Sequence, residues 1–314
     1  MNKPFIEKYK PTNIDELILD NIIRIELKSF IENKNIPNVI FYGNTGSGKT
    51  LSIQTLIKSI YHPKNLNAVI EFNASDERGI KINDDILKFI KIKINFREGY
   101  CQKKLFVFEE ADNFTDKTQQ LINSNIEKNP NISFCFTCTN LNKILESIQS
   151  RCIIINFTNL NEIDIKNRLN YICLNEQIIH NDEALLYLIR ICKKDLRVII
   201  NLLEAIYYTE NEINIENIQN VMGIPFTILY DNLLTSILSK NKSDILEDIK
   251  KLRLNGYDSL DVLTYFIDYI FYNNELDNDN KIHLLNHLSK NLIIMNKTIN
   301  NYLQLTKILL NTIE

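Results

Sequence analysis

The hydrophobic pattern of this chain of 314 residues changes character along its length. Between residues 39 and 157, short apolar or alternating runs are separated by stretches whose apolar residues recur at helical spacing. The first kind of run predicts buried strands and the second predicts helices that pack on them. The predicted strands lie at 39–42, 68–72, 105–108, 132–138 and 152–157, and the predicted helices near 49–60, 80–94, 115–128 and 142–149. This alternation is typical of a parallel sheet with helices on both faces.

The strand signals stop after residue 161, and helical spacing then continues along the rest of the chain. Turn-forming residues interrupt it at 223–225 and at 255–257. We therefore predict three domains: an α/β domain with a five-stranded parallel sheet over 1–158, a small helical domain over 159–222, and an all-α domain over 223–314.

Composition limits the classes of protein to which the chain can belong. Hydrophobic residues make up 45% of it, enough for sizeable cores, and the formal net charge is −3. Because the surface as a whole is not strongly basic, any contact with nucleic acid must use a local basic patch or depend on an assembly. No apolar run approaches the length of a membrane-spanning helix, and the first residues lack the apolar core of a signal peptide. We expect an intracellular, soluble protein with no membrane partner.

Cys135 and Cys138 have the spacing of a zinc-ribbon pair. They lie in the alternating run 132–139, where residues three apart point to opposite faces of a strand. The sequence contains no second C-x-x-C pair to complete a tetrahedral site, so the pattern favours buried thiols.

Residues 43–50 fit the phosphate-loop pattern G-x-x-x-x-G-K-[ST] at every fixed position. The glycines can adopt positive φ and let backbone N–H groups surround an anion. Lys49 would bring a cation to the β- and γ-phosphate oxygens, and the Thr50 hydroxyl would be a Mg²⁺ ligand. A predicted helix follows the loop, so its N-terminus would point at the phosphates. The predicted nucleotide-binding residues here are Gly43, Asn44, Thr45, Gly46, Ser47, Gly48, Lys49 and Thr50.

An acidic motif directly follows the predicted strand 105–108. Glu109 and Glu110 occupy the place where P-loop ATPases carry their Walker B acids. The first acid would hold the Mg²⁺ shell and the second would polarise the attacking water, so Glu109 is the candidate metal residue and Glu110 the candidate base. Aspartate is usual at the first position. The extra methylene of Glu109 matters for direct ligation, because Mg²⁺ demands near-ideal octahedral geometry.

Around these motifs the chain resembles the small subunits of replication factor C, the AAA+ clamp loaders of eukaryotes, archaea and some DNA viruses. PFIEKYKP at 4–11 looks like the family's W-V-E-K-Y-R-P segment, and EFNASDERGI at 71–80 is similar to its L-N-A-S-D-E-R-G-I box. SRC at 150–152 matches the S-R-C motif, DLR at 195–197 resembles the G-D-L-R segment, and the residues at 256–257 look like part of the collar signature. The likeness runs along nearly the whole chain.

The resemblance implies an ATPase that uses ATP and Mg²⁺ at a site shared between subunits. It places Tyr9 and Lys10 beside the adenine, Asn140 as the sensor-1 residue and Arg197 as the sensor-2 residue. It makes Arg151 the arginine that reaches into a neighbouring subunit's ATP site. Such an arginine stabilises charge developing on the γ-phosphate and can be worth ~10³–10⁵ in rate.

The resemblance also implies partners: other clamp-loader subunits in a hetero-oligomer, expected to be a pentamer, together with a sliding clamp and primer-template DNA. The domain at 159–222 would be a lid, and the domain at 223–314 a collar that holds the oligomer together. Apolar helix positions would make the collar contact, among them Leu260, Leu263, Phe266 and Ile270. Replication would place the protein in the nucleus, or at a cytoplasmic replication site such as a viral factory if the source is viral.

DNA contact is expected first at Arg78 and Lys81, which open the helix after the asparagine-alanine-serine-aspartate box. The family tracks the duplex backbone in a sequence-independent way. It usually carries an arginine pair in the helix after Walker B, where this chain has Asn123 and Ser124, and Gln120 occupies the position of a glutamine proposed to couple DNA to the catalytic acid. A merely solvated helix end stays an alternative for Arg78 and Lys81.

Two other functions stay open at this point. The chain could be a structural subunit of the same kind of complex that binds nucleotide but hydrolyses it weakly, which Glu109 in place of aspartate would favour. It could also be a different AAA+ DNA-remodelling ATPase, a class that forms homohexamers without a dedicated collar.

Overall fold

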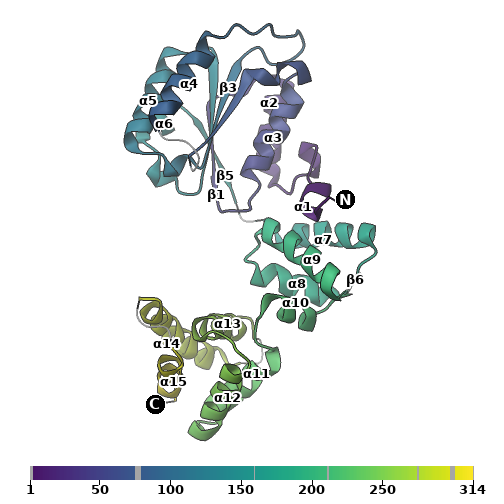
Figure 1. The fold of residues 1–314 in the computed structure, drawn as a ribbon, viewed down its shortest axis with the longest axis vertical. Coiled ribbons are helices and arrows are strands. Elements are labelled where there is room, and N and C mark those ends of the chain that lie inside the picture. Colours follow the sequence, from purple (N-terminus) through teal and green to yellow (C-terminus); the bar gives the residue numbers. More distant parts are fainter. Residues whose placement is uncertain are drawn as a thin grey trace. The chain divides into compact units, whose positions relative to one another are not determined.

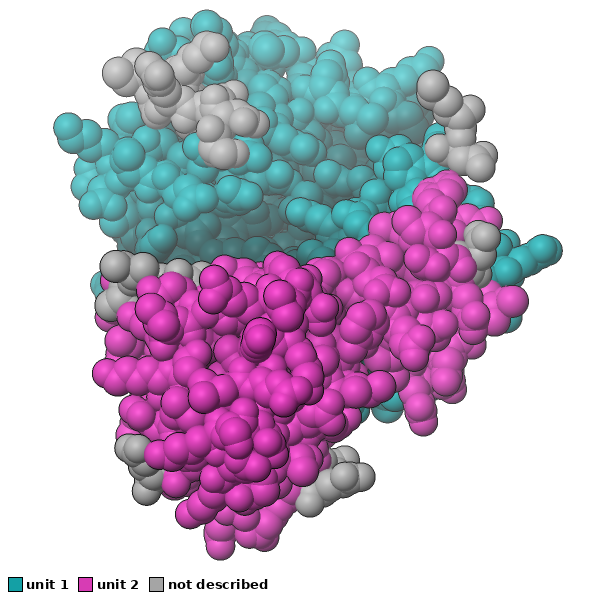
Figure 2. Space-filling model, turned by 60° about the horizontal axis from the view of Figure 1, so that its bottom comes forward, with its two compact units in different colours: residues 1–178, 185–204 teal, residues 179–184, 205–314 magenta. Residues whose placement is uncertain are grey.

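The computed structural model describes residues 3–74, 79–158, 160–210, 212–273, 276–297 and 301–313. The chain divides into two compact units, coloured separately in Figure 2: residues 1–178 with 185–204, and residues 179–184 with 205–314. The boundaries predicted after residues 158 and 222 stay a prediction.

A five-stranded parallel sheet lies at the centre of the first unit (Figure 1). Its strands are β1 (Val39–Gly43), β2 (Val69–Asn73), β3 (Lys104–Glu109), β4 (Ile132–Cys138) and β5 (Ile153–Phe157), in the spatial order β2-β3-β4-β1-β5. One face is covered by α2 (Asn21–Glu32) and α3 (Lys49–Ile60), and the other by α4 (Gly79–Lys91), α5 (Asp116–Lys128) and α6 (Glu146–Gln149). All the pairs between neighbouring strands are parallel, which confirms the predicted α/β fold.

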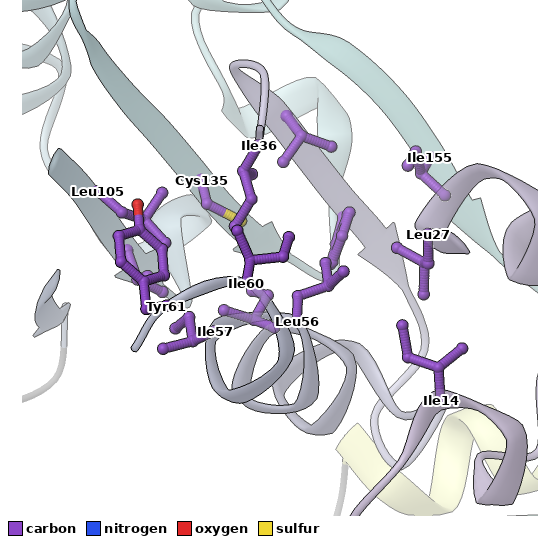
Figure 3. Packing of buried hydrophobic residues seen from close by; sticks show 14 of the residues in the cluster. Ile14, Leu27, Ile36, Leu56, Ile57, Ile60, Tyr61, Leu105, Cys135 and Ile155 are labelled. Carbon is purple, nitrogen blue, oxygen red and sulfur yellow. The ribbon is translucent and has the colours of Figure 1, made fainter. Parts of the chain in front are cut away.

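Alternate side chains of each strand enter two separate cores, one on each face of the sheet. Val39 and Phe41 of β1 belong to the same buried cluster as Leu27 of α2 and Leu56 of α3, part of which Figure 3 draws. Ile40, between the two strand residues, enters the opposite core. Burying each such side chain stabilises the fold by about 1.5–3 kcal/mol, so the period of two in the sequence fixes which face of β1 meets which helices.

The core under α4 and α5 is largely aromatic. Phe106 and Phe108 of β3 stack on Phe134 and Phe136 of β4, with ring centroids 5.3 and 5.2 Å apart. Phe72 of β2 lies 5.4 Å from Phe108. All three contacts join residues that are register partners across neighbouring strands. Cross-strand aromatic pairs of this kind stabilise one register over a slipped one.

Cys135 and Cys138 of β4 enter opposite cores, as the alternation predicts. Both are buried, and burial raises the pKa of the Cys138 thiol to about 12. The prediction of buried thiols is therefore confirmed.

Some predicted helices differ in detail from the structure. The helix predicted at 142–149 is a 3-10 turn, η4 (Leu141–Lys143), followed by α6, because Ile144 and Leu145 between them are extended. The helix predicted to reach residue 94 ends at Lys91, and the Lys104 ammonium donates to backbone carbonyls at that end. Two helices, α1 (Phe5–Lys8) and α2, lie outside the predicted ranges. Three further 3-10 turns are η1 (Ile14–Glu16), η2 (Pro63–Ala68) and η3 (Ala111–Asn113).

The region after the sheet is not purely helical. Its helices are α7 (Glu162–Glu176), α8 (Asp182–Ile191), α9 (Leu196–Glu210) and α10 (Ile215–Met222). A short parallel pair, β6 (Ile179–His180) with β7 (Glu212–Ile213), corrects the expectation that strands end before residue 161. Strands this short carry no readable alternation, which is why the pattern missed them.

Five helices close the chain and share one core: α11 (Thr227–Leu238), α12 (Lys242–Leu254), α13 (Ser259–Tyr272), α14 (Asn278–Lys297) and α15 (Tyr302–Asn311). Leu263, Phe266 and Ile270 are buried in this core, and Leu260 packs against it. The expectation that these positions meet other subunits is therefore wrong for Leu263, Phe266 and Ile270, whose apolar side chains are buried within the chain, and it stays a prediction for the partly buried Leu260. Large apolar side chains that do face solvent in these helices include Leu254 and Leu303, 75% and 80% exposed.

Among the described residues, no single helix is both long and apolar enough to cross a membrane. Helices α10 and α11 meet that test of length and composition only when counted together, across a bend of 90°.

Candidate nucleotide-binding site

The loop between β1 and α3 has a backbone that only glycine fits at two positions. Gly43 and Gly46 have φ of 154° and 72°. A Cβ atom on Gly43 would lie 2.2 Å from the carbonyl oxygen of Phe157, and one on Gly46 would lie 2.3 Å from Oδ1 of Asp195. Gly48, with φ of 93°, precedes the first residue of α3. The loop is therefore held in a tight curve between the end of a buried strand and a helix N-terminus, the geometry of an anion cradle.

The polar groups of this loop fit a bound phosphate chain. Ser47 is 4% exposed, and its buried hydroxyl oxygen has no hydrogen-bond partner. The Lys49 ammonium donates to the carbonyl oxygens of Gly43 and Asn44, at 2.7 Å each. Burial lowers the pKa of Lys49, since it penalises the charged form. A phosphate anion would supply the acceptor that Ser47 lacks and a counter-charge for Lys49.

Glu109 and Thr50 meet at the carboxyl end of β3. Glu109 is the last residue of the strand, and the Thr50 hydroxyl lies near enough to favour its charged form. Burial raises the pKa of Glu109, and the neighbouring carboxylate of Glu71 raises it further, while Thr50 lowers it. A carboxyl whose charged form is penalised is a suitable place for a divalent cation, and these oxygens are of the kind that Mg²⁺ prefers. The sequence-predicted metal pair is thus brought together.

Glu110 is held differently from Glu109, in a left-handed backbone conformation with φ of 52°. Its N–H donates to the Thr137 hydroxyl oxygen at 3.1 Å, and its Oε2 accepts from the Asn113 side-chain amide at 3.2 Å. A left-handed conformation is costly for a non-glycine residue and is found where function requires it. The Glu110 side chain is exposed, so water can reach its carboxylate, as a general base requires.

Asp112 joins the loop after β3 to the loop after β4, a link that the sequence analysis did not predict. Its Oδ2 accepts from the Thr139 N–H, the Thr139 hydroxyl and the Asn140 N–H, at 3.2, 2.6 and 3.1 Å. Burial acts to raise the pKa of Asp112, but these bonds outweigh it and hold the pKa below its ordinary value. Asp112 therefore fixes the place of Asn140, the predicted sensor-1 residue. The only sequence signal was its membership of the acidic motif.

Arg197 stands in the first turn of α9, close to the phosphate loop. Its charge acts on both Lys49 and Glu109, lowering the pKa of each. The Asp195 carboxylate accepts from the Arg197 N–H at 3.0 Å and so caps the helix, while the same carboxylate lies against Gly46. The predicted sensor-2 residue is thus brought to the site.

Arg151 lies elsewhere. It precedes β5 at the amino edge of the sheet, whereas the phosphate loop follows β1 at the carboxyl edge. The aligned parts of β1 and β5 span about 13 Å at 3.3 Å per residue. Its guanidinium pairs with Glu127 of α5 at 2.6 Å and donates to the Ser147 carbonyl oxygen at 2.6 Å. The arginine is 38% exposed, and these two contacts are with α5 and α6.

Tyr9 and Lys10 anchor the N-terminal segment to two helices. The Tyr9 hydroxyl donates to Glu176 of α7, and burial, with that bond, raises the pKa of Tyr9. The Lys10 ammonium donates to the Gln54 side chain of α3 at 2.7 Å. Neither residue lines the hollow beside the phosphate loop described next.

A hollow of about 290 Å³ adjoins the phosphate loop at Ser47. Side chains from three segments line it: Ile18 and Leu19 before α2, Phe157 at the end of β5, and Asn161 at the start of α7. The rest of the lining is mixed and includes two carboxylates, Asp20 and Asp164. The apolar part of the hollow, directly beside a phosphate cradle, fits a planar base attached to those phosphates. These lining residues could not be predicted, because they belong to no motif and come from segments far apart in the sequence.

Arg78 lies outside the described residues, and so does the side chain of Lys81, although its backbone belongs to α4. Gln120 is exposed on α5.

Two family descriptions match the chain. "DNA polymerase III, delta subunit" matches residues 20–161, and "Replication factor C C-terminal domain" matches residues 228–311. The first covers the sheet and the phosphate loop, and the second covers the C-terminal helices.

Curated relatives match over most of their length. A probable replication factor C subunit 5 of Caenorhabditis elegans is 32% identical over 86% of this chain and 76% of its own. A putative replication factor C small subunit of Acanthamoeba polyphaga mimivirus is 35% identical over 78% and 73%. Replication factor C subunit 5 of Homo sapiens is 30% identical over 92% and 85%.

A solved structure shares the fold. The Thermotoga maritima RuvB Holliday junction branch migration motor aligns with a TM-score of 0.55, 14% sequence identity, 73% of this chain and 79% of its own.

Proposed function

Because the chain belongs to the replication factor C small-subunit family, we propose that it is an ATPase subunit of a clamp loader, which opens a sliding clamp and loads it onto primer-template DNA. The observation that carries the proposal is the phosphate loop, with its glycine-only curve and Lys49 held at its centre, beside the Glu109 carboxyl at the end of β3. The family membership weighs against a remodelling ATPase, since the likeness to RuvB concerns the fold alone.

ATP would bind along the loop, with its base in the hollow lined by Ile18, Leu19 and Phe157. Backbone N–H groups of the loop, the Ser47 hydroxyl and the Lys49 ammonium would hold the phosphates. Tyr9 and Lys10, which were predicted beside the adenine, would act by fastening the N-terminal segment to α7 and α3.

Mg²⁺ would be held by the Thr50 hydroxyl and by Glu109, directly or through water. When bound, the ion supplies charge neutralisation at the β- and γ-phosphate oxygens. Its arrival would favour the ionised form of Glu109, so the penalty that burial imposes on this carboxylate is relieved in the loaded state.

Glu110 would accept a proton from the attacking water, with its carboxylate oriented by the left-handed turn and by Asn113. Asn140, fixed by Asp112, would orient the same water or the γ-phosphate from the loop after β4. Arg197 would add a positive charge on the lid side. These groups come from one chain and would not by themselves complete the site.

Arg151 would complete the site of a neighbouring subunit. Its place at the amino edge of the sheet supports this role, because an arginine there is remote from the loop of its own chain and exposed to a partner. A planar, permanently charged guanidinium suits the charge that develops on the γ-phosphate. Hydrolysis would then require assembly with other subunits, in a hetero-oligomer expected to be a pentamer.

One observation favours a second candidate, a subunit that binds nucleotide but hydrolyses it weakly. Glu109 replaces the usual aspartate, and burial and Glu71 both raise its pKa, so the metal-holding carboxylate is longer and less readily ionised than an aspartate with ordinary surroundings.

The test is reconstitution. Co-purification from the native source, followed by mass determination, would identify the partner subunits. In the assembled complex, Lys49→Ala should abolish nucleotide binding at this site. Arg151→Ala should keep nucleotide binding while lowering DNA-stimulated ATPase by about 10³-fold at the one site it completes. Lys128→Ala, which removes an exposed cation from the same helix end as Glu127, is the matched control and should change neither.

Three outcomes separate the candidates. Normal clamp loading with Glu110→Gln would favour the weakly hydrolysing subunit. Loss of hydrolysis in Arg151→Ala when the chain is assayed alone would show that the arginine acts within its own chain. A closed homohexamer without affinity for a clamp would overturn the clamp-loader proposal.

A further inference from the structure

An acidic side chain lies directly against the phosphate loop. A Cβ atom placed on Gly46 would be 2.3 Å from Oδ1 of Asp195, 2.5 Å from its Cγ and 2.9 Å from Oδ2, so the whole carboxylate covers this glycine. Gly46 and Asp195 are 149 positions apart in the sequence, and both belong to the first compact unit. The contact places a negative charge beside a loop whose backbone is arranged for anions.

The position of Asp195 is fixed by its surroundings. Its Oδ1 accepts from the N–H of Arg197 at 3.0 Å, so the carboxylate is tied to the first turn of α9. The two preceding residues, Lys193 and Lys194, both have left-handed backbones, with φ of 51° and 64°. The Lys194 ammonium pairs with Glu162 of α7 at 3.1 Å. The turn that presents the carboxylate is therefore held at both of its ends.

No ion pair within the described part of the chain neutralises Asp195. Lys49 and Arg197 are near enough for their charges to be felt, yet the Lys49 ammonium donates to the backbone of the loop. A phosphate chain in the cradle would compete for these cations, and it would meet the Asp195 charge at short range. Like charges within a few ångströms in a partly buried site repel by an amount that is not small compared with a binding free energy.

We propose that Asp195 sets the nucleotide affinity of this site: its carboxylate, held against Gly46, opposes the negative charge of bound phosphates, so that nucleotide is bound more weakly and released faster. The inference rests on the proposed function, since it takes the loop to be an ATP site. Its value to a loader is that one chain could exchange ADP for ATP without a separate exchange factor.

The proposal predicts a dependence on ligand charge. Mg²⁺ cancels part of the phosphate charge, so removing the Asp195 charge should help Mg²⁺-free nucleotide more than Mg²⁺-bound nucleotide. A role limited to helix capping would make no such distinction, because the cap does not meet the ligand.

The experiment is equilibrium binding of a fluorescent ADP analogue to the purified full chain, with and without Mg²⁺. Asp195→Asn keeps the cap, because asparagine is as good an N-cap as aspartate, and it removes only the charge. The Asp195→Asn variant should bind the ADP analogue about tenfold more tightly than wild type when Mg²⁺ is absent, and the gain should be smaller when Mg²⁺ is present. The analogue should also dissociate more slowly from the variant. Asp258→Asn makes the same change at the N-cap of α13 in the second unit and should leave binding unchanged.

The outcomes are distinguishable. Unchanged binding in Asp195→Asn, with a normal melting temperature, would show that Asp195 is only a cap and would overturn the inference. Weaker binding would also overturn it, because Asp195 would then act as a latch that supports the loop. A wild-type chain that binds no nucleotide either alone or in its complex would instead count against the proposed function.

Discussion

The glycines of the phosphate loop should differ sharply in what an alanine costs. At Gly48, φ is 93° and nothing lies within 4 Å of an added Cβ, so alanine would be penalised only by the left-handed backbone. This penalty lowers the free energy of unfolding by roughly 1–2 kcal/mol, and the lower entropy of the unfolded alanine chain offsets part of it. At Gly43 the added Cβ meets the Phe157 carbonyl oxygen at 2.2 Å, an atom of the neighbouring strand that cannot turn aside. Overpacking and backbone strain together should raise this cost to roughly 3–5 kcal/mol.

The assay is hydrogen exchange in urea, followed by mass spectrometry on the nucleotide-free chain. Exchange in peptides from β1 and β5 reports the stability of the first unit. Global unfolding would mix the stabilities of the two units. Gly43→Ala should lower the urea midpoint of these peptides by about 1 M or more, given a slope of about 1–3 kcal/mol per M. Gly99→Ala, at a surface glycine with φ of 84° and open surroundings, is the control and should resemble Gly48→Ala. Equal losses at Gly43 and Gly48 would refute the steric argument.

Three further substitutions test the electrostatics and strain of the site. Glu109→Gln should raise the melting temperature of the nucleotide-free protein at pH 7.5. Burial raises the pKa of Glu109 in the folded state, so wild-type stability falls as the pH rises from the unfolded pKa through the raised folded pKa. The gain should therefore shrink on acidification through this range, and a pH-independent gain would contradict the reasoning. Lys193→Gly should stabilise the first unit by about 0.5–1 kcal/mol by relieving φ of 51°, whereas Lys193→Ala should not, as hydrogen exchange in urea on peptides of that unit can check. Asp112→Asn should cost about 1 kcal/mol, and its effect should be non-additive with Thr139→Val in a double-mutant cycle; additive losses would mean that the bridge contributes nothing.

The phosphate loop and the sheet were predictable because their signals are local. The curve of the loop depends on glycines within a few residues of one another, and each strand's alternation follows from a period of two. The same locality explains why Glu109, at the end of β3, and Thr50, at the start of α3, were expected at one metal site and lie near each other.

Contacts between distant segments were not predictable in this way. The sequence offered no sign that Asp195 covers Gly46 or that Asp112 holds Asn140, because neither pairing leaves a periodic trace. Leu263 and Phe266 illustrate a different limit. Helical spacing identifies an apolar face but does not say whether the same chain or another subunit covers it, and here the same chain does.

The placement of Arg151 and the phosphate loop at opposite edges of the sheet determines how many complete sites an assembly can contain. If each chain offers an arginine at one edge of its sheet and a loop at the other, subunits join head to tail. A closed ring built this way completes every site, whereas an open row completes one fewer than its number of members. The member at one end of such a row has a loop that no arginine reaches, and the member at the other end has an arginine without a recipient. In an open assembly, the order of the subunits thus decides which of them can lose its loop, or its arginine, without loss of activity.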